Sequence, residues 1–351
     1  MKLGTKLKIP LRNAEMVHDG GEDGDPQMGC FPKGSGVKRK RCIKVKPKDQ
    51  RFKIVNSCSG FLCLSKPTRN NPVAVCNPVT GEYINLPVAN RGDENMDGFV
   101  DCGFGFSPRT NQYKVRRMFD QWTRDHRFAN REGYYGRGAE IHTLGTESWR
   151  SIDNTPQSRY KLAFPTYLDG GLHWLCLDKG CCLYSSGSEV IVTFDLDSER
   201  FQSVLQLPHE YHSEGSSDKG TRKVSMGVLG GCLCICDASG YSPIDIWVMK
   251  KYGVQESWTN LFSIDTICDE RWPYGLYQPI NFIKNGTVLI FHYFKSALIH
   301  YDDRRLRFRY LKVRGAKSRF EAIAHIPSFL SLKDAVVGDK AVVMNVNTRY
   351  G

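Results

Sequence analysis

Hydrophobic residues along most of this chain occur in short runs that are separated by turn residues. Residues 57–87, SCSGFLCLSKPTRNNPVAVCNPVTGEYINLP, show the pattern, with turns at Gly60 and at Asn77–Gly81. Short runs rich in Val, Ile, Phe and Tyr, bounded by Gly, Asn and Pro, predict β-strands. A single meander of this size cannot bury both faces of its sheet, so we expect it to pack against further sheets.

The same strand-and-turn unit recurs along the chain. The five copies span residues 57–87, 101–153, 167–208, 226–265 and 281–313. Glycines open them at positions 60, 105, 171, 231 and 286, with spacings of 45, 66, 60 and 55 residues. Four-stranded units at such a period predict an all-β fold, a β-propeller-like ring of about five to six antiparallel blades. The segment FEAIAHI at 320–326 either begins a sixth blade or closes the ring. The alternative fold is a large β-sandwich.

Residues 1–50 differ from the rest of the chain. They contain glycine clusters and the basic run KRKRCIKVKPK at 38–48, and residues 1–51 carry seven of the twelve net positive charges. Low hydrophobicity predicts a disordered basic tail, followed by the propeller-like domain at 51–330 and a C-terminal tail at 331–351. The basic run is a nuclear-import signal, a nucleic-acid patch or a solvated linker.

Cysteine usage and hydropathy indicate where the protein works. The 351 residues include 13 cysteines, and no secretory signal or membrane-spanning apolar run is found. We therefore expect a reducing compartment, cytoplasmic or nuclear, and no membrane contact. Cys232, Cys234 and Cys236 alternate in GGCLCICD, which places them on one sheet face, as buried apolar residues instead of zinc ligands.

Motifs that would carry chemistry are incomplete in this sequence. His209 and His212 in HEYH are three residues apart, whereas the helical zinc motif needs a separation of four. The lysine of GSSDKGT, at 215–221, precedes its second glycine, so it would miss a bound phosphate. Asn285-Gly286-Thr287 predicts a hairpin turn. We therefore expect no catalytic residue, no metal and no cofactor.

Aromatic residues divide into a core group and a loop group. Trp149 and Trp258 follow Glu-Ser pairs in equivalent units, so we expect a shared packing role. Trp174 is expected in the core, and His173 is either a structural histidine or a channel-lining residue. The insert 119–138 and the loop 268–279 are rich in the residue types that anchor interfaces. Their candidate partner-binding residues are Trp122, Tyr134, Tyr135, Trp272, Tyr274 and Tyr277.

The ordered motifs resemble the F-box-associated interaction domain of plant F-box proteins, a kelch-like β-propeller module. They are SCSGFLCL (57–64), VCNPVTGEYINLP (75–87), GFGFSPRTNQYKV (103–115), EIHTLGTESWRSID (140–153), DGGLHWLCL (169–177), IVTFDLDSERFQSVLQLP (191–208) and IDIWVMKKYGVQESWTNLFSI (244–264). The resemblance implies a module that holds a substrate for a ubiquitin ligase, while an F-box docks on a Skp-type adaptor and a cullin. No F-box pattern is found in residues 1–50.

The sequence therefore predicts a non-enzymatic protein-recognition module whose protein substrate is unidentified. Adaptor and cullin contacts are expected only if an F-box is supplied. Two alternatives stay open. One is an enzyme built on a propeller, a metal-dependent oxidase or a glycan-processing protein. The other is a nucleic-acid binder acting through residues 38–48. Nucleic acid is the less favoured partner class.

Overall fold

A computed structural model gives the fold of most of the chain. It describes residues 52–67, 70–88, 96–123, 134–152, 162–176, 190–202, 205–208, 223–239, 243–265, 275–283, 286–311, 313, 320–338 and 341–345, with backbone only at 96–99, 121–123, 134–136 and 190. The predicted basic tail at 1–50 lies outside these residues.

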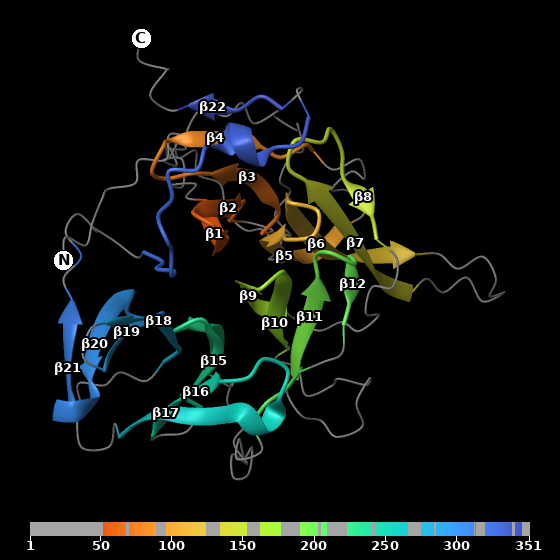
Figure 1. Cartoon of the computed structure of the whole chain (residues 1–351). Coiled ribbons are helices and arrows are strands. Elements are labelled where there is room, and N and C mark those ends of the chain that lie inside the picture. Colours follow the sequence, from red (N-terminus) through yellow and green to blue (C-terminus); the bar gives the residue numbers. More distant parts are fainter. Residues whose placement is uncertain are drawn as a thin grey trace, which may run out of the picture.

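The described strands form five antiparallel sheets arranged as blades around a ring (Figure 1). Blade 1 contains β1 (Lys53–Cys58), β2 (Phe61–Ser65), β3 (Pro72–Cys76), β4 (Glu82–Asn85) and the later β22 (Met344–Asn345). Blade 2 contains β5 (Met96–Ser107), β6 (Gln112–Thr123), β7 (Tyr134–Thr143) and β8 (Arg150–Ser151). Blade 3 contains β9 (Leu162–Leu168), β10 (Gly171–Cys176), β11 (Val190–Asp195) and an interrupted outer strand, β12 (Arg200–Phe201) and β13 (Leu205–Gln206).

The remaining two blades repeat this order. Blade 4 contains β14 (Val224–Leu229), β15 (Cys232–Asp237), β16 (Ile244–Met249), the 3-10 turn η3 (Gln255–Ser257) and β17 (Trp258–Ile264). Blade 5 contains β18 (Tyr277–Ile283), β19 (Thr287–His292), β20 (Ala297–Asp302), η4 (Asp303–Arg305) and β21 (Arg307–Leu311). In each blade the first strand lies innermost, since β1, β5, β9, β14 and β18 contact their neighbours in that order. The predicted propeller-like fold is thus confirmed, with five blades in the described residues.

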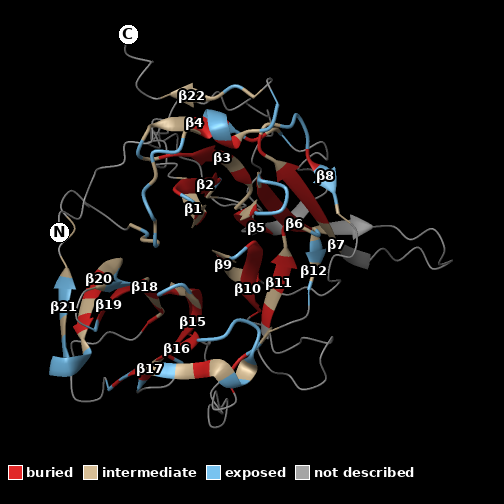
Figure 2. Ribbon diagram, in the orientation of Figure 1, coloured by how far each residue is buried: buried red, intermediate tan, exposed pale blue. Residues whose placement is uncertain are grey.

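Hydrophobic clusters fill the spaces between neighbouring blades, which explains how each meander buries its two faces. One cluster joins blade 1 to blade 2, and others join blades 2 and 3, 3 and 4, and 4 and 5. Buried residues accordingly occupy the middle of the blades, while the outer strands contain mostly intermediate and exposed residues (Figure 2). Cys234 and Cys236 are fully buried in the cluster between blades 4 and 5, and Cys232 packs against it, as predicted.

The junction between blades 5 and 1 is built differently, by residues 320–338, which we call the closing segment. Phe320 packs on the blade 5 cluster, with its ring centroid 5.6 Å from that of Phe291. Ile323 packs on the separate blade 1 cluster. Residues 320–326 form no strand, so the expectation of a sixth blade is wrong, while that of a closing element is confirmed.

The closing segment then binds the outer turn of blade 1. The side-chain amide of Asn77 donates hydrogen bonds to the carbonyls of Ser328 at 3.0 Å and Leu330 at 2.8 Å. The short helix α1 (Leu332–Ala335) follows, and the Glu82 carboxylate accepts a 2.9 Å hydrogen bond from the Leu332 amide. Because α1 is packed into the core and β22 pairs with β4, the prediction of a separate C-terminal tail at 331–351 is wrong for residues 331–338 and 341–345.

Two glycines allow this close approach. Gly145 has φ +101°, and a Cβ atom there would lie 2.2 Å from the carbonyl oxygen of Val337. Gly60 has φ +89°, and its Cβ would lie 2.2 Å from the Cβ of Ser328. Any side chain at either position would therefore push the closing segment away from blades 1 and 2.

We expect Gly145→Ala to destabilise the protein by about 2–4 kcal/mol, because left-handed strain of about 1–2 kcal/mol adds to a backbone clash. Gly253→Ala is the matched control, since Gly253 has φ +79° and a Cβ added there would have no atom within 4 Å. Urea unfolding measures both losses, and hydrogen exchange at residues 320–338 locates the first. Equal losses in the two variants would show that the clash is absent.

Candidate recognition face

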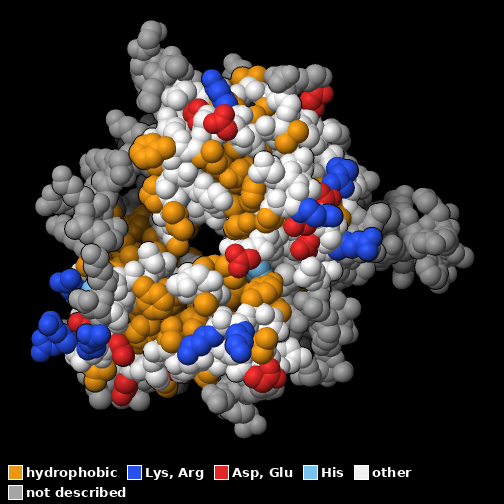
Figure 3. Space-filling model, viewed as in Figure 1, with side chains coloured by type: hydrophobic (Ala, Val, Ile, Leu, Met, Phe, Trp, Pro, Cys, Tyr) orange, Lys and Arg blue, Asp and Glu red, His pale blue; other side chains and the backbone are white. Residues whose placement is uncertain are grey.

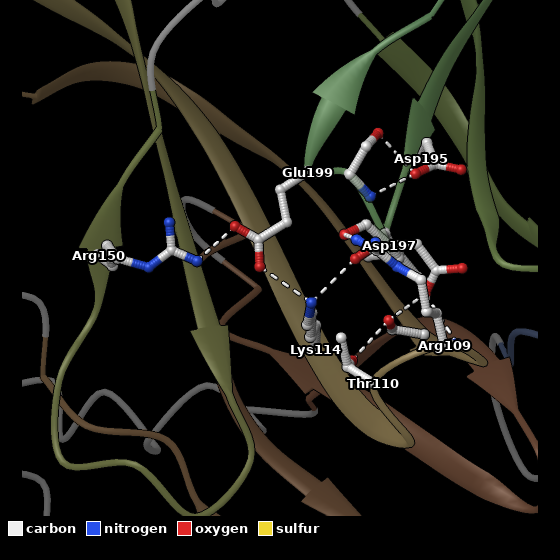
Figure 4. Close-up of polar contacts among 10 residues, drawn as sticks. Arg109, Thr110, Lys114, Arg150, Asp195, Asp197 and Glu199 are labelled. Atoms are coloured by element: carbon white, nitrogen blue, oxygen red, sulfur yellow. Dashed lines mark hydrogen bonds and ion pairs between the residues drawn. The ribbon is translucent and has the colours of Figure 1, made fainter.

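A polar cluster joins blade 2 to blade 3 at the turns β5–β6 and β11–β12 (Figure 4). Lys114, which is 2% exposed, places its Nζ 2.9 Å from the Glu199 carboxylate and 2.9 Å from the carbonyl of Leu196. Arg150 pairs with the other oxygen of Glu199. Burial alone would raise the pKa of Glu199, but hydrogen bonds from Arg150 and Lys114 lower it overall. The carboxylate thus stays charged and holds two blades together.

A second set of contacts in the same cluster is centred on Asp197. Its carboxylate accepts hydrogen bonds from the Ser107 hydroxyl and, at 3.1 Å, from the amide of Arg109. The Arg109 guanidinium donates to the Asp197 carbonyl at 3.0 Å. The innermost turn of blade 2 is thereby fixed to the outer turn of blade 3.

Arg116, in β6, is fully buried between the same two blades. Its guanidinium carbon lies 4.8 Å, 4.8 Å and 4.3 Å from the ring centroids of Trp174, Phe194 and Phe201. Burial lowers the pKa of Arg116 to about 9, against a smaller raising effect of Asp101. The contact is cation–π packing in the interior, and it rigidifies the blade interface.

The two equivalent tryptophans tie each of their blades to the preceding one. The Trp149 indole donates a 2.7 Å hydrogen bond to the carbonyl of Pro87, and the Trp258 indole donates a 3.0 Å bond to the carbonyl of Gln206. Both side chains are 8% exposed. The predicted shared packing role is confirmed. Trp174 is also buried, as predicted, and donates to the carbonyl of Cys102 at 3.2 Å.

His173, in β10, is a buried structural histidine, and the channel-lining alternative is wrong. Its Nε2 lies 2.7 Å from the hydroxyl of Tyr252, which comes from blade 4, and its Nδ1 lies 3.3 Å from the carbonyl of Thr166. Burial lowers the pKa of His173 to about 4, against smaller raising effects of its hydrogen bonds.

We expect His173 to make stability depend on pH. Its folded pKa lies below the ordinary value of about 6.5, so the unfolded chain binds the proton more readily. The contribution of neutral His173 to the free energy of unfolding is complete above about pH 6.5. It is lost as the pH falls toward 4, by up to about 1.4 kcal/mol per pH unit. Urea unfolding of the wild type and of His173→Gln between pH 7 and pH 4 measures the difference. A difference independent of pH would contradict this assignment.

The ring has two unlike faces. Within each blade, the first-to-second and third-to-fourth connections leave on one side, which we call the turn face. The Gly170 turn lies against Pro108, and the Gly230 turn lies against Phe282, so the turns of neighbouring blades share this side. The connections there contain two to eight residues. They include the hairpin at Gly286, as predicted for the Asn-Gly sequence.

The other connections leave on the opposite side, which we call the long-connection face. All six connections of ten or more residues between consecutive strands from β1 to β21 lie there, and the longest contains 17. Binding residues commonly lie on loops that a rigid scaffold positions but does not need for its own packing. The asymmetry therefore makes the long-connection face the candidate recognition face.

Aromatic side chains from blades 3 and 5 lie close together at this face. Phe164, in β9, has φ +56°, which is rare for a bulky residue, and it lies at a bulge before Pro165. Its ring centroid lies 6.1 Å from that of Tyr293 in blade 5. Phe294, the next residue, is 61% exposed. Sequence patterns missed these residues, because a left-handed phenylalanine looks like any other strand residue.

Three of the predicted partner-binding residues lie in strands next to a connection of this face. Trp122 and Tyr135 are cross-strand partners in the β6–β7 hairpin, and Tyr134 pairs with Thr123. The prediction of a loop at 119–138 is therefore wrong for 119–123 and 134–138, which extend the two strands. The partner-binding role of these three residues stays a prediction.

The second predicted binding loop is divided by the start of β18. Trp272 and Tyr274 lie outside the described residues, in the connection between β17 and β18. Tyr277 lies in β18, 2% exposed, with its ring centroid 4.7 Å from that of His292. Its assignment to a loop is wrong, and its ring offers a partner almost no surface.

Catalytic and metal-binding arrangements are incomplete in the described part of the chain. There, no group of three or more His, Cys, Asp and Glu residues is placed to hold a metal ion. The Ser57 hydroxyl lies 3.0 Å from Nδ1 of His325, which brings a serine and a histidine together. The Ser57 hydroxyl also lies 3.2 Å from the carbonyl of Phe61. Nε2 of His325 has no hydrogen-bond partner among the described residues. The acid that orients the imidazole in a catalytic triad is therefore missing from the described part of the chain. HEYH and GSSDKGT lie outside the described residues.

No helix in the part of the chain that the structure describes is long and apolar enough to cross a membrane. The eight cysteines whose side chains are described are all free thiols. Burial raises the pKa of the Cys234 thiol to about 12, which keeps it protonated and unreactive.

Comparison with known proteins identifies a matching domain over most of the chain. The family model of the F-box associated beta propeller domain matches residues 34–331. An F-box protein of Arabidopsis thaliana is 28% identical over 303 residues, covering 78% of this chain and 69% of that protein. F-box protein CPR1 of the same plant is 24% identical, covering 84% and 70%. Among solved structures, a nidogen/laminin complex aligns with a TM-score of 0.36 at 11% identity, over 73% of this chain and 78% of that one.

Proposed function

This chain belongs to the family of F-box associated beta propeller domains, and from that premise we propose that it holds a protein substrate for ubiquitin transfer. The substrate is bound and presented without chemical change by this chain. A Skp-type adaptor and a cullin join the complex only if an F-box is supplied, as the names of the similar F-box proteins suggest. Nuclear or cytoplasmic action follows from the same proposal.

The observation that carries the proposal is the structural difference between the two faces. The turn face is held by the Lys114–Glu199–Arg150 contacts and by short turns, so it has little freedom to adapt to a partner. The long-connection face carries every connection of ten or more residues between β1 and β21. A rigid scaffold with long connections on one side is the usual arrangement of a recognition protein.

Aromatic residues of two connections support the same face as the binding surface. Trp122 and Tyr135 pair with each other next to the β6–β7 connection, which leaves on the long-connection face. Trp272 belongs to the connection that enters blade 5. Trp and Tyr give large contact areas at low entropic cost, and an interface of standard size buries about 1,200–2,000 Å² in total. Both connections emerge on one side of the ring, so a single partner can reach them together.

The test compares partners recovered with two variants from plant cells in which the proteasome is inhibited. The first variant carries Trp122→Ala, Tyr135→Ala and Trp272→Ala. The matched control carries Val79→Ser and Val254→Ser, exposed residues on the turn face, 41% and 42% exposed. We expect proteins that accumulate ubiquitin with the wild type to be lost from the first variant by about tenfold or more and retained by the control. Retention by both variants would overturn the assignment of the face.

A further inference from the structure

The outer edge of blade 5 differs in charge from the rest of the ring. Blade 5 ends in the turn η4 and the strand β21, with the sequence DRRLRFRYL. Its exposed basic side chains are Lys295, Arg304, Arg305, Arg307 and Arg309. Figure 3 shows Lys and Arg side chains gathered around this edge. The sequence pattern marked the segment only as a strand, although arginines at alternate strand positions were the signal.

These arginines have almost no carboxylate partners within the described part of the chain. The ion pair found there joins Arg305 to Asp302 at 3.8 Å, with the Arg305 side chain 77% exposed. Arg304, Arg307 and Arg309 form none with described residues. Arginine binds carboxylates through a planar, two-pronged geometry, so the surface offers unused recognition groups for acidic side chains.

The backbone of the same strand is also available for pairing. β21 is the last strand in the order β18-β19-β20-β21, and no described strand pairs with its outer side. Blade 1 shows that an outer edge of this fold accepts an additional strand, because β22 pairs antiparallel with β4, placing Met344 opposite Tyr83. An extended peptide can join a sheet edge in this way, with main-chain hydrogen bonds giving affinity and side chains giving specificity.

The other outer edges of the ring lack this combination. The outer edge of β4 is covered by β22, and Arg150 of β8 pairs with Glu199. β17 has the sequence WTNLFSI, without a charged residue. The outer strand of blade 3 is interrupted. Only β21, among the described outer strands, combines an unpaired edge of five residues with several exposed arginines.

We propose that the outer edge of β21 binds an extended acidic segment of a partner protein as an added strand. Arg307 and Arg309 project from the same face of β21, about 7 Å apart, so carboxylates at alternate positions of the added strand meet them. Opposite charges across paired strands favour the pairing over one between uncharged residues. Tyr310, 41% exposed on the other face, gives apolar contact beside Lys295, whose Nζ lies 5.9 Å from its ring centroid.

The arginines also explain why the edge does not pair indiscriminately. Charged residues on an edge strand discourage aggregation with another copy of the same strand, because two β21 strands would bring like charges together. An acidic strand removes that repulsion. The surface lies at the rim of the ring and is distinct from the long-connection face, so this proposal does not depend on the function proposed above.

The test measures the binding of fluorescein-labelled peptides to the whole chain by fluorescence anisotropy. The probe is an alternating Glu-Val octapeptide. We expect saturable binding that weakens with salt, and about a tenfold or greater loss of affinity in the double variant Arg307→Glu, Arg309→Glu. Lys251→Glu, an exposed basic residue in the β16–β17 turn, is the control and should bind as the wild type does. The double variant Arg307→Gln, Arg309→Gln should lose less affinity, and it replaces the first variant if the reversed charges impair folding.

Strand addition has its own readout. The same peptide with alternate backbone nitrogens methylated keeps its charges but cannot complete the hydrogen bonds, so we expect it to bind about tenfold more weakly or worse. Equal binding of the methylated peptide would overturn strand addition. Equal binding by the arginine variants, or tighter binding of a single-stranded oligonucleotide than of the acidic peptide, would overturn the proposed partner class.

Discussion

Replacing Glu140 by alanine should destabilise the protein by about 3–5 kcal/mol, since it leaves a buried arginine without its counter-charge. Arg117, 1% exposed, donates from Nε to the Glu140 carboxylate at 2.8 Å, and Glu140 is 6% exposed. The guanidinium carbon of Arg117 also lies 5.0 Å from the Trp149 ring centroid. The remaining bond to Asn71, 3.0 Å long, cannot replace a carboxylate. The urea-unfolding midpoint of the Glu140→Ala variant measures the loss.

An exposed pair gives the matched control for this variant. Asp302→Ala removes the partner of Arg305, whose side chain is 77% exposed, and should cost no more than about 1 kcal/mol. A double variant, Arg117→Leu with Glu140→Leu, should recover much of the loss, because an apolar replacement leaves no buried charge. If Glu140→Ala cost as little as Asp302→Ala, the buried pair would have no structural role.

The second large effect is expected at the tryptophans that join neighbouring blades. Trp258→Ala should cost about 3–5 kcal/mol, because it leaves a cavity in the cluster between blades 3 and 4 and removes the bond to the Gln206 carbonyl. Trp149→Ala should cost a similar amount at the blade 1–2 interface. Calorimetric Tm and urea-unfolding free energies measure both.

Phenylalanine separates packing from hydrogen bonding at these two positions. Trp258→Phe keeps an aromatic ring but loses the indole N–H, so it should cost less than the alanine variant. In the phenylalanine variant, loss of the indole hydrogen bond alone should lower the free energy of unfolding by about 1 kcal/mol. A loss confined to one of the two tryptophans would contradict their equivalence, which rests on matching bonds to Pro87 and Gln206.

The blades themselves could be predicted because each local signal agrees with the final structure. Turns at Gly60, Gly231 and Gly286 need positive φ, and all three glycines adopt it. Between the turns, apolar side chains mark strands that are buried on both faces. The matched Glu-Ser-Trp sequences before β8 and β17 predicted equivalent packing, because the same neighbour contacts recur in a repeated fold.

The closing segment could not be predicted, because its apolar residues serve two different blades. Phe320 and Ala322 pack toward blade 5 and Ile323 toward blade 1. Their spacing looks like that of a strand, although they bridge two sheets and belong to neither. The sequence KVRRM likewise gave no sign that Lys114, Arg116 and Arg117 are buried, since their environment is assembled from blades distant in sequence.

The candidate site was only partly accessible from the sequence. The chemistry of Trp122 and Tyr135 marks them as candidate binding residues, but polar neighbours make the two long paired strands look like a loop. The sequence pattern puts Tyr277 in the same loop as Tyr274, because nothing in a proline-rich stretch marks where β18 begins. The grouping of all long connections on one face needs the strand order, which no local pattern contains.

The position of the closing segment has a consequence for synthesis of the protein. Residues 320–338 are translated after strands β1 to β21, and until they leave the ribosome they cannot lie between the clusters of blades 5 and 1 that they contact. The nascent chain therefore carries an open apolar surface on blade 1 during most of its elongation, and a second one on blade 5 near the end. Chaperones that shield such surfaces on the ribosome should be needed up to the last stage, and depleting them should reduce the yield of folded protein more than slowing translation does.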